Sequence, residues 1–302
     1  MAHIGRTAGL FSGLARSAMK PSDLATASGL YLPAVEAWCS AATAYGFIEK
    51  KAGGKLSLPK RMKHILVDKT HPDYLGGQFT YLALRSLEYG AFEDLFKYGK
   101  TRQLSSAFEA IEEATHWDHY AFIRAIRMSG RLHMILTRGC SFADIGCGTG
   151  SLITKLCASY PKSRYYGIDS SDKAVASARE ALKDKPATIV KLKGERLRFT
   201  EEFDIVYLGE SLYAAEDKPV FVANCYRSLK KGGTLLILEG LITEGNLAKD
   251  DLLIKGMQID FALQGHRFMT RHELELILRD TGFRDVRFNP LGGSVYLASA
   301  RK

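Results

Sequence analysis

Along residues 138–302, short apolar runs alternate with stretches whose apolar residues recur at helical spacing. The short runs are typical of buried strands, and the amphipathic stretches are typical of helices. Strands that alternate with helices predict a parallel sheet joined by crossover helices. The predicted strands cover 142–145, 164–168, 187–191, 203–208 and 234–238, and the predicted helices start at 151 and cover 216–229 and 273–278.

The last part of the pattern is different. Two more strands are predicted at 283–288 and 295–299, joined by a short link that holds Asn289-Pro290 and Gly292-Gly293. A link of this length permits only antiparallel pairing, because a parallel crossover needs about a dozen residues or more. The pattern therefore predicts a terminal antiparallel hairpin on a parallel sheet.

The residues before 138 are predicted to be mostly helical. Helices are expected over 4–19, where small residues allow close packing, over 22–29 with Ser22 as N-cap, and over 34–45 with Pro33 at its favoured first position. A hairpin over 47–58 follows, and two short helices before a hairpin predict a winged helix. We divide the chain into a winged-helix domain at 1–100, connecting helices at 101–137 and a sheet domain at 138–302.

Composition narrows the class of protein. The chain has 302 residues, 46% of them hydrophobic, and a formal net charge of +9. Its five cysteines include no C-x-x-C pair and no Cys/His spacing of a zinc site, which predicts reduced thiols, a cytoplasmic location and no metal centre. Charges interrupt the first twenty residues, and no apolar run could span a bilayer, so neither a secretion signal nor a membrane partner is expected.

The stretch 142–152, F-A-D-I-G-C-G-T-G-S-L, carries the clearest chemistry. Gly146, Gly148 and Gly150 stand between a predicted strand and a predicted helix, where glycines can take positive φ and the helix start favours a polar ligand. Asp169 ends the next strand, 169 − 150 = 19 residues past the last glycine. That spacing is typical of a carboxylate that binds ribose hydroxyls.

At these residues the chain resembles the class I, Rossmann-like S-adenosylmethionine-dependent methyltransferases. The D-I-G-C-G-T-G motif matches their first motif, and Asp169 matches the acid that ends their second strand. A nicotinamide enzyme is the alternative, although the third glycine comes one residue too early for G-x-G-x-x-G. The resemblance implies a seven-stranded sheet, the cofactor S-adenosyl-L-methionine and the product S-adenosyl-L-homocysteine. The implied cofactor-binding residues are Asp144, Gly146, Cys147, Gly148, Gly150, Asp169, Ser170, Glu195, Gly209 and Glu210.

The N-terminal part resembles the N-terminal domain of small-molecule O-methyltransferases. The resemblance lies in D-L-A-T-A-S-G-L, A-W-C-S-A-A-T-A-Y-G-F-I-E-K and K-L-S-L, and it implies that the winged helix makes a homodimer. The predicted wing is rich in lysine, which would also suit DNA. Residues 34–45, however, contain no Arg, Lys, Asn or Gln to contact base edges, which disfavours nucleic acid as a partner.

The catalytic residues stay open at this stage. The resembling family places a basic histidine after its fourth strand, and Tyr213 occupies that position here. Glu239 matches the family's flanking acid, and His266 lies near where the family places a second acid. His266 could take the acceptor's proton, held by Glu239, or it could only line a polar pocket.

The resemblance also implies a substrate pocket. Its predicted residues are His116, Trp117, His119, Tyr120, Phe122, Met257 and Phe261. A simpler alternative exists for the residues between 116 and 122. Trp117 and Phe122 would pack in the core, while His116 and His119 would lie on the surface.

We therefore predict a methyltransferase that acts on a small molecule, with O-methylation favoured. One alternative is an RNA or DNA methyltransferase, although G-E-S-L follows the fourth strand where an N-P-P-Y motif would stand. A second alternative is a winged-helix transcription regulator that senses the cofactor.

Overall fold

The computed structural model describes residues 1–87, 92–101, 111, 113–242, 252–292 and 294–302. The chain divides into two compact units. The N-terminal unit comprises Met1–Phe92 and Leu104–Tyr120, and the C-terminal unit comprises Glu93–Gln103 and Ala121–Lys302. The three-domain division proposed above stays a prediction.

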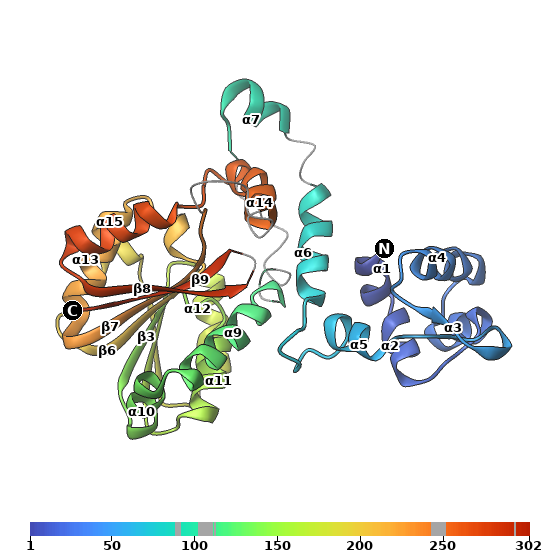
Figure 1. Cartoon of the computed structure of the whole chain (residues 1–302), viewed down its shortest axis with the longest axis horizontal. Helices are drawn as coiled ribbons and strands as arrows, with labels where there is room; N and C mark the ends of the chain where they lie inside the picture. Colours follow the sequence, from blue (N-terminus) through green and yellow to red (C-terminus); the bar gives the residue numbers. More distant parts are fainter. Residues whose placement is uncertain (88–91, 102–110, 112, 243–251, 293) are drawn as a thin grey trace. The chain divides into compact units, whose positions relative to one another are not determined.

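The N-terminal unit is built from helices and one small hairpin (Figure 1). Its elements are α1 (Ala2–Thr7), α2 (Leu10–Arg16), α3 (Pro21–Ser28), α4 (Leu32–Ala44), β1 (Glu49–Lys50), η1 (Ala52–Gly54), β2 (Leu56–Ser57), α5 (Lys60–Leu66) and α6 (Gly76–Ser86). Strands β1 and β2 pair antiparallel, with Lys50 opposite Leu56. The predicted hairpin is present after α3 and α4, and the assignment of this unit as a winged helix stays a prediction.

Two local predictions in this unit were wrong. The helix expected over 4–19 is two helices, because Gly9 takes a left-handed conformation with φ 73°. Ser22 is not an N-cap: α3 starts at Pro21, and no side chain caps it. The expected close packing is present, since a Cβ on Gly5 would lie 2.4 Å from the Trp38 ring.

The C-terminal unit contains a seven-stranded sheet in the order β5-β4-β3-β6-β7-β9-β8. All neighbouring pairs are parallel except β7–β9 and β9–β8. The strands are β3 (Ser141–Ile145), β4 (Arg164–Asp169), β5 (Ala187–Lys191), β6 (Phe203–Gly209), β7 (Leu229–Gly240), β8 (Arg284–Gly292) and β9 (Val295–Arg301). The predicted fold class and its terminal antiparallel strands are confirmed; Gly293, in the predicted link, lies outside the described residues.

Helices cover both faces of this sheet (Figure 1). Successive side chains of β7 point to opposite faces, so Leu235 and Ile237 join one core while Leu236 and Leu238 join the other. The helices of the chain from α7 onward are α7 (Phe92–Tyr98), α9 (His116–Met128), α10 (Gly130–Arg138), α11 (Ser151–Ser159), α12 (Asp172–Ala181), α13 (Lys218–Ser228), α14 (Leu252–Leu263) and α15 (Arg271–Thr281), with short turns η3 (Gly194–Arg196) and η4 (Leu212–Ala214).

Local capping fixes several of these helices. The Asp217 side chain accepts a hydrogen bond from Val220 N and starts α13 two residues after the predicted position. Thr270 and Glu273 form a capping box at α15, and Gly282 ends that helix in a left-handed conformation.

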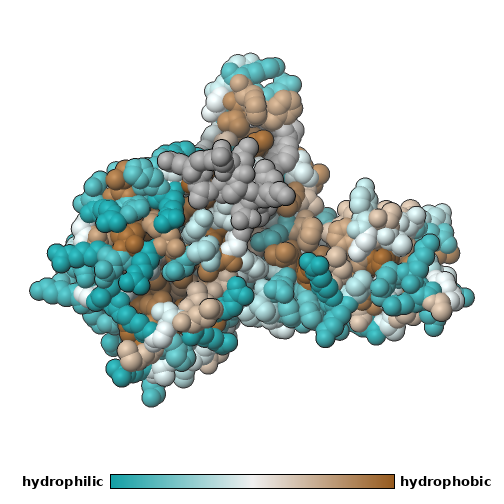
Figure 2. Space-filling model, in the orientation of Figure 1, coloured by the Kyte–Doolittle hydropathy of each residue, from teal (hydrophilic) through white to brown (hydrophobic). Residues whose placement is uncertain are grey.

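On the face drawn in Figure 2, hydrophilic and apolar side chains are interspersed over both units. No helix in the described ranges is long and apolar enough to cross a bilayer.

Candidate functional site

The glycine turn joins β3 to α11 at the carboxyl edge of the sheet. The backbone N–H groups of Gly146 and Cys147 both donate to the carbonyl of Ile168, at 2.7 and 3.1 Å. Gly146, Gly148 and Gly150 have φ values of 86°, 54° and 77°, a region that favours glycine. A Cβ on Gly146 would lie 2.6 Å from Ser211, whereas a Cβ on Gly148 would meet nothing within 4 Å. The turn is therefore packed at its first glycine and open at its second.

Asp169 connects this turn to the next one. Its Oδ2 accepts a hydrogen bond from Gly148 N at 3.0 Å, and its Oδ1 accepts one from Ser171 N at 2.9 Å. Ser170 beside it is exposed. The carboxylate thus holds the glycine loop and the start of α12 together.

Asp144 lies at the end of β3 and is 3% exposed. Burial, with the nearby charge of Asp169, raises the pKa of its carboxyl to about 8. No described residue donates a hydrogen bond to it. Burial likewise raises the pKa of the neighbouring Cys147 thiol, so this cysteine is a packing residue and not a thiolate. A cationic ligand would stabilise the ionised form of Asp144.

The other predicted cofactor residues follow β5 and β6. Glu195 in η3 accepts a hydrogen bond from Glu216 N at 2.9 Å, so one oxygen of its carboxylate holds a turn. Glu210 has a positive φ of 48°, and its side chain accepts a hydrogen bond from Gly240 N at 3.2 Å. A Cβ on Gly209 would lie 2.5 Å from the Tyr207 hydroxyl, so this glycine is required by packing.

Glu239 is the most buried acid near these strand ends, with 1% exposure at the end of β7. Its Oε1 accepts hydrogen bonds from Leu212 N at 2.5 Å and Tyr213 N at 3.0 Å. Its buried Oε2 has no hydrogen-bond partner among the described residues. Burial raises the pKa of the carboxyl to about 7, although these amides and the charge of Lys218 act in the opposite direction. Glu239 therefore holds the backbone of η4.

The Tyr213 ring belongs to an aromatic cluster beside η4. It lies 4.5 Å from the Phe261 ring and 5.7 Å from the His266 ring, measured between centroids. Met257 packs against the same cluster. Burial, and then the charge of Lys218, lowers the pKa of His266. Neutral imidazole is thus the favoured form of His266 near pH 7.

Glu239 and His266, both described residues, do not hydrogen-bond to each other: Oε1 of Glu239 accepts from the η4 backbone, and its buried Oε2 has no partner among the described residues. A role of Glu239 in orienting His266 stays a prediction. The structure does bring Tyr213, His266, Met257 and Phe261 together. The prediction of site residues from the sequence did not include Lys218 or Ser211. Ser211 donates from Oγ to the Ile145 carbonyl at 2.9 Å, and its place two residues after β6 was the available signal.

The remaining predicted pocket residues lie on α9. Phe122 is fully buried in the sheet core, with its ring 4.0 Å from that of Tyr207, so it is a packing residue and not a substrate contact. His116, Trp117, His119 and Tyr120 fall in the N-terminal unit. There the His116 ring lies 5.2 Å from that of Tyr120. A pocket that combines these four residues with Met257 and Phe261 stays a prediction.

Part of the chain matches a known protein family, and several curated proteins are similar to it. Residues 143–237 match the family described as "Methyltransferase domain". A trans-aconitate 2-methyltransferase from Deinococcus radiodurans is 31% identical over 98 residues, 31% of this chain and 35% of that protein. A malonyl-[acyl-carrier protein] O-methyltransferase from Bacillus anthracis is 25% identical over 177 residues, 54% of this chain and 64% of that protein. The chain thus matches between about one third and two thirds of the length of these curated relatives.

Solved structures with the same fold cover the whole chain. The pyocyanin biosynthetic protein PhzM superimposes with a TM-score of 0.77 at 17% identity, over 99% of this chain and 93% of that chain. Human N-acetylserotonin methyltransferase in complex with SAM gives a TM-score of 0.73 at 18% identity, over 100% and 92%. With its sheet order, its glycine turn and this domain match, the chain carries a methyltransferase domain and has the class I fold of the S-adenosylmethionine-dependent methyltransferases.

Proposed function

We propose that this protein is an S-adenosylmethionine-dependent methyltransferase that transfers a methyl group to a small molecule, with a hydroxyl oxygen as the favoured acceptor atom. One observation carries the proposal. The glycine turn, held to Asp169 through Gly148 N, stands at the carboxyl edge of the sheet inside the region that matches the methyltransferase domain. Ligands of open α/β sheets bind at this edge.

The residues present fit the cofactor. The open face at Gly148 admits a ligand against the backbone, and α11 starts without a side-chain cap, so its first N–H groups can bind polar atoms. The buried carboxyl of Asp144, which lacks a donor among the described residues, suits a cationic cofactor. Asp169 would hold the ribose. Glu195 could approach the adenine with the carboxylate oxygen that does not hold the turn.

When bound, the cofactor supplies an electrophilic methyl group on a sulfonium. The chain must position the acceptor and exclude water, because positioning carries much of the rate. The cluster of Tyr213, Phe261 and Phe268 provides apolar walls for this purpose. A base is needed where the acceptor is a neutral hydroxyl.

His266 is our candidate for that base. Its lowered pKa leaves the imidazole free to accept a proton near neutral pH. Tyr213 is less suited, because a neutral phenol hydroxyl is a weaker proton acceptor than a neutral imidazole nitrogen. Glu239 acts through the backbone of η4 and positions Tyr213. If the acceptor arrives already nucleophilic, His266 only lines the pocket.

We also propose a cytoplasmic homodimer formed through the N-terminal unit. The apolar residues of α2 do not support a dimer, because Leu10, Phe11 and Leu14 are buried in the unit's own core. The support comes instead from Tyr31 and Tyr45, which flank α4 and are 76% and 75% exposed. Paired chains would bury such surface.

Two alternatives remain to be tested. One is a methyltransferase that acts on nucleic acid, and the other is a transcription regulator that senses the cofactor and is not an enzyme. Human N-acetylserotonin methyltransferase and mitomycin 7-O-methyltransferase MmcR, both named for small-molecule acceptors, share the fold and favour the enzyme. A gel shift with genomic fragments tests the regulator. Transfer of labelled methyl to bulk tRNA or DNA tests the nucleic-acid enzyme.

Calorimetry tests the proposal itself. The full chain should bind S-adenosylmethionine and S-adenosylhomocysteine and should not bind NAD. A panel of phenols and hydroxylated metabolites should then yield S-adenosylhomocysteine. Tight binding of NAD with none of the methyl donor would overturn the assignment.

A further inference from the structure

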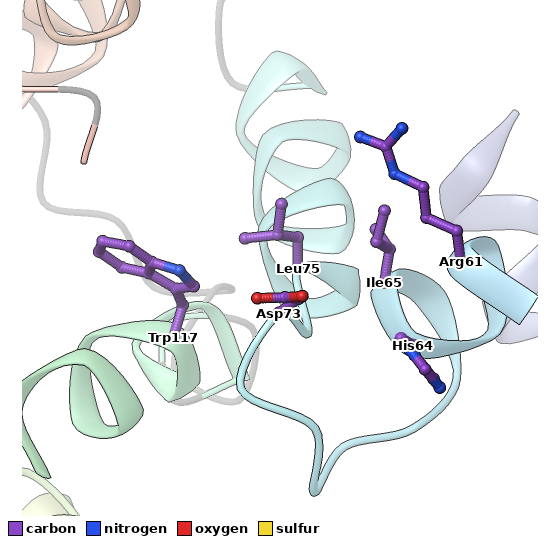
Figure 3. A pocket seen from close by; sticks show the side chains of 6 residues that line it. All are labelled: Arg61, His64, Ile65, Asp73, Leu75 and Trp117. Atoms are coloured by element: carbon purple, nitrogen blue, oxygen red, sulfur yellow. The ribbon is translucent and has the colours of Figure 1, made fainter. Parts of the chain in front are cut away.

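The N-terminal unit contains a cavity of about 250 Å³ that is lined by residues of this unit (Figure 3). Helix α5, the segment that leads into α6 and the first turn of α9 form its wall. Its lining residues are Arg61, His64, Ile65, Asp73, Leu75 and Trp117. In Figure 3, Trp117 lies on one side and Arg61 on the other, with Asp73 between them.

Hydrogen bonds fix the wall of this cavity. Leu75 N donates to the Ile65 carbonyl at 2.9 Å, which ties the segment before α6 to α5. Asp73 N donates to His71 Nδ1 at 3.2 Å, and the His71 ring stacks on His64 with 3.9 Å between centroids. These contacts fix the two walls formed by α5 and the segment before α6, so little ordering of these walls would be required on binding.

The lining carries two opposite charges over an apolar floor. Arg61 forms no ion pair with any described residue. Asp73 lies 3.9 Å from His71 Nδ1 and its side chain is 73% exposed, so it can still accept from a ligand. Ile65, Leu75 and Trp117 are half-buried and supply the floor and one aromatic face. A ligand that satisfies this lining needs an anionic group, a cationic donor and a flat apolar part.

We propose that this cavity binds a small aromatic α-amino acid. Its carboxylate would pair with the Arg61 guanidinium, its ammonium with the Asp73 carboxylate, and its ring would pack on the Trp117 indole. The volume is slightly below the ~300–1,000 Å³ of pockets for drug-sized ligands, which suits a molecule with one ring.

Tryptophan fluorescence tests this site in the full chain. The chain has two tryptophans, and the other, Trp38, is 6% exposed in the core, so Trp117 should report on the cavity. Titration with L-phenylalanine should give a saturable change, which Trp117→Phe should abolish. Arg61→Gln should weaken binding by about tenfold or more, the scale of a charge-assisted contact. Lys63→Gln, an exposed cation on the same helix that does not line the cavity, is the matched control.

Two analogues separate the charged contacts. Phenethylamine lacks the carboxylate and 3-phenylpropionate lacks the ammonium, so each should bind about tenfold more weakly than phenylalanine. Arg61→Gln should not weaken phenethylamine further, and Asp73→Asn should not weaken 3-phenylpropionate further. The proposal is overturned if phenylalanine gives no saturable signal in fluorescence or calorimetry, or if Arg61→Gln and Lys63→Gln bind it equally well. Because the readout is binding in the N-terminal unit, the result does not depend on methyl transfer.

Discussion

The carboxylate of Asp169 accepts a hydrogen bond from the backbone N–H of Gly148 at 3.0 Å, across 21 residues of sequence. The acid that the sequence assigns to the cofactor's ribose is thus also a structural support of the glycine turn. Its other oxygen holds Ser171 N at the start of α12. Replacing Asp169 is therefore expected to loosen both the glycine turn and the start of α12.

Asp169→Ala should weaken binding of S-adenosylmethionine by roughly 1–3 kcal/mol, the scale of a lost hydrogen bond to a charged group. Calorimetry measures the loss. Asp172→Ala, which removes an exposed carboxylate in the first turn of α12, should leave the affinity unchanged. Equal affinities for the two variants would contradict the assigned role of Asp169.

Gly148→Val should abolish cofactor binding while the fold is kept. The site has room for a Cβ, but φ is 54°, where a β-branched residue is strained, and the side chain would occupy the open face of the turn. Circular dichroism checks the fold and calorimetry checks the binding. Normal binding by this variant would mean that the ligand does not lie on Gly148.

Glu239 should make stability depend on pH. Its folded-state pKa of about 7 lies above the ordinary value of 4.5, so the protonated form favours folding. The stability that protonated Glu239 contributes is fully present below pH 4.5 and is lost as the pH rises through about 7. At pH 8 the free energy of unfolding should be lower by up to about 3 kcal/mol.

Glu239→Gln keeps an oxygen for the η4 amides and removes the charge, so it should stabilise the protein at pH 8 and change little at pH 4.5. Guanidinium denaturation at both values measures the difference. Glu180→Gln, at a 75% exposed site, serves as the control. If wild type and Glu239→Gln show the same pH dependence, the carboxyl is not buried as described.

His266→Ala should lower kcat by roughly 10²–10⁴-fold if this residue is the general base, once an acceptor is found. Because its pKa is lowered, the wild-type rate should fall only below about pH 6.5, and the variant should lose that limb. His272→Ala, on the exposed side of α15, is the control. A change confined to KM would assign His266 to the pocket lining. If only Tyr213→Phe stops turnover with cofactor binding intact, Tyr213 is the catalytic group.

Tyr31→Glu combined with Tyr45→Glu should convert the proposed dimer to a monomer, because charge would enter the exposed apolar surface beside α4. Light scattering at micromolar concentration gives the mass. Met128→Glu, at an 81% exposed site in α9, should remain dimeric. A wild-type monomer at this concentration would exclude the dimer.

The sequence by itself determined the order of strands and helices, the terminal hairpin and the glycine motif with its acid. These features depend on local spacing: apolar periodicity, a glycine at a positive φ, and an acid at the end of a strand. For the same reason, local pattern placed the strands over 164–168 and 187–191 close to β4 and β5. The sequence did not reveal the break at Gly9, because the apolar spacing continues across it.

Tertiary structure decided what the candidate side chains do. Glu239, which the sequence offered as one possible partner of His266, accepts hydrogen bonds from the backbone of η4, because β7 and the turn after β6 meet only in the folded sheet. Phe122 and Trp117 are five residues apart on α9, and one is in the sheet core while the other lines a cavity of the N-terminal unit. Periodicity identifies the apolar side of a helix, but the neighbour that covers it comes from distant parts of the chain, so burial, pKa and partners follow from the fold alone.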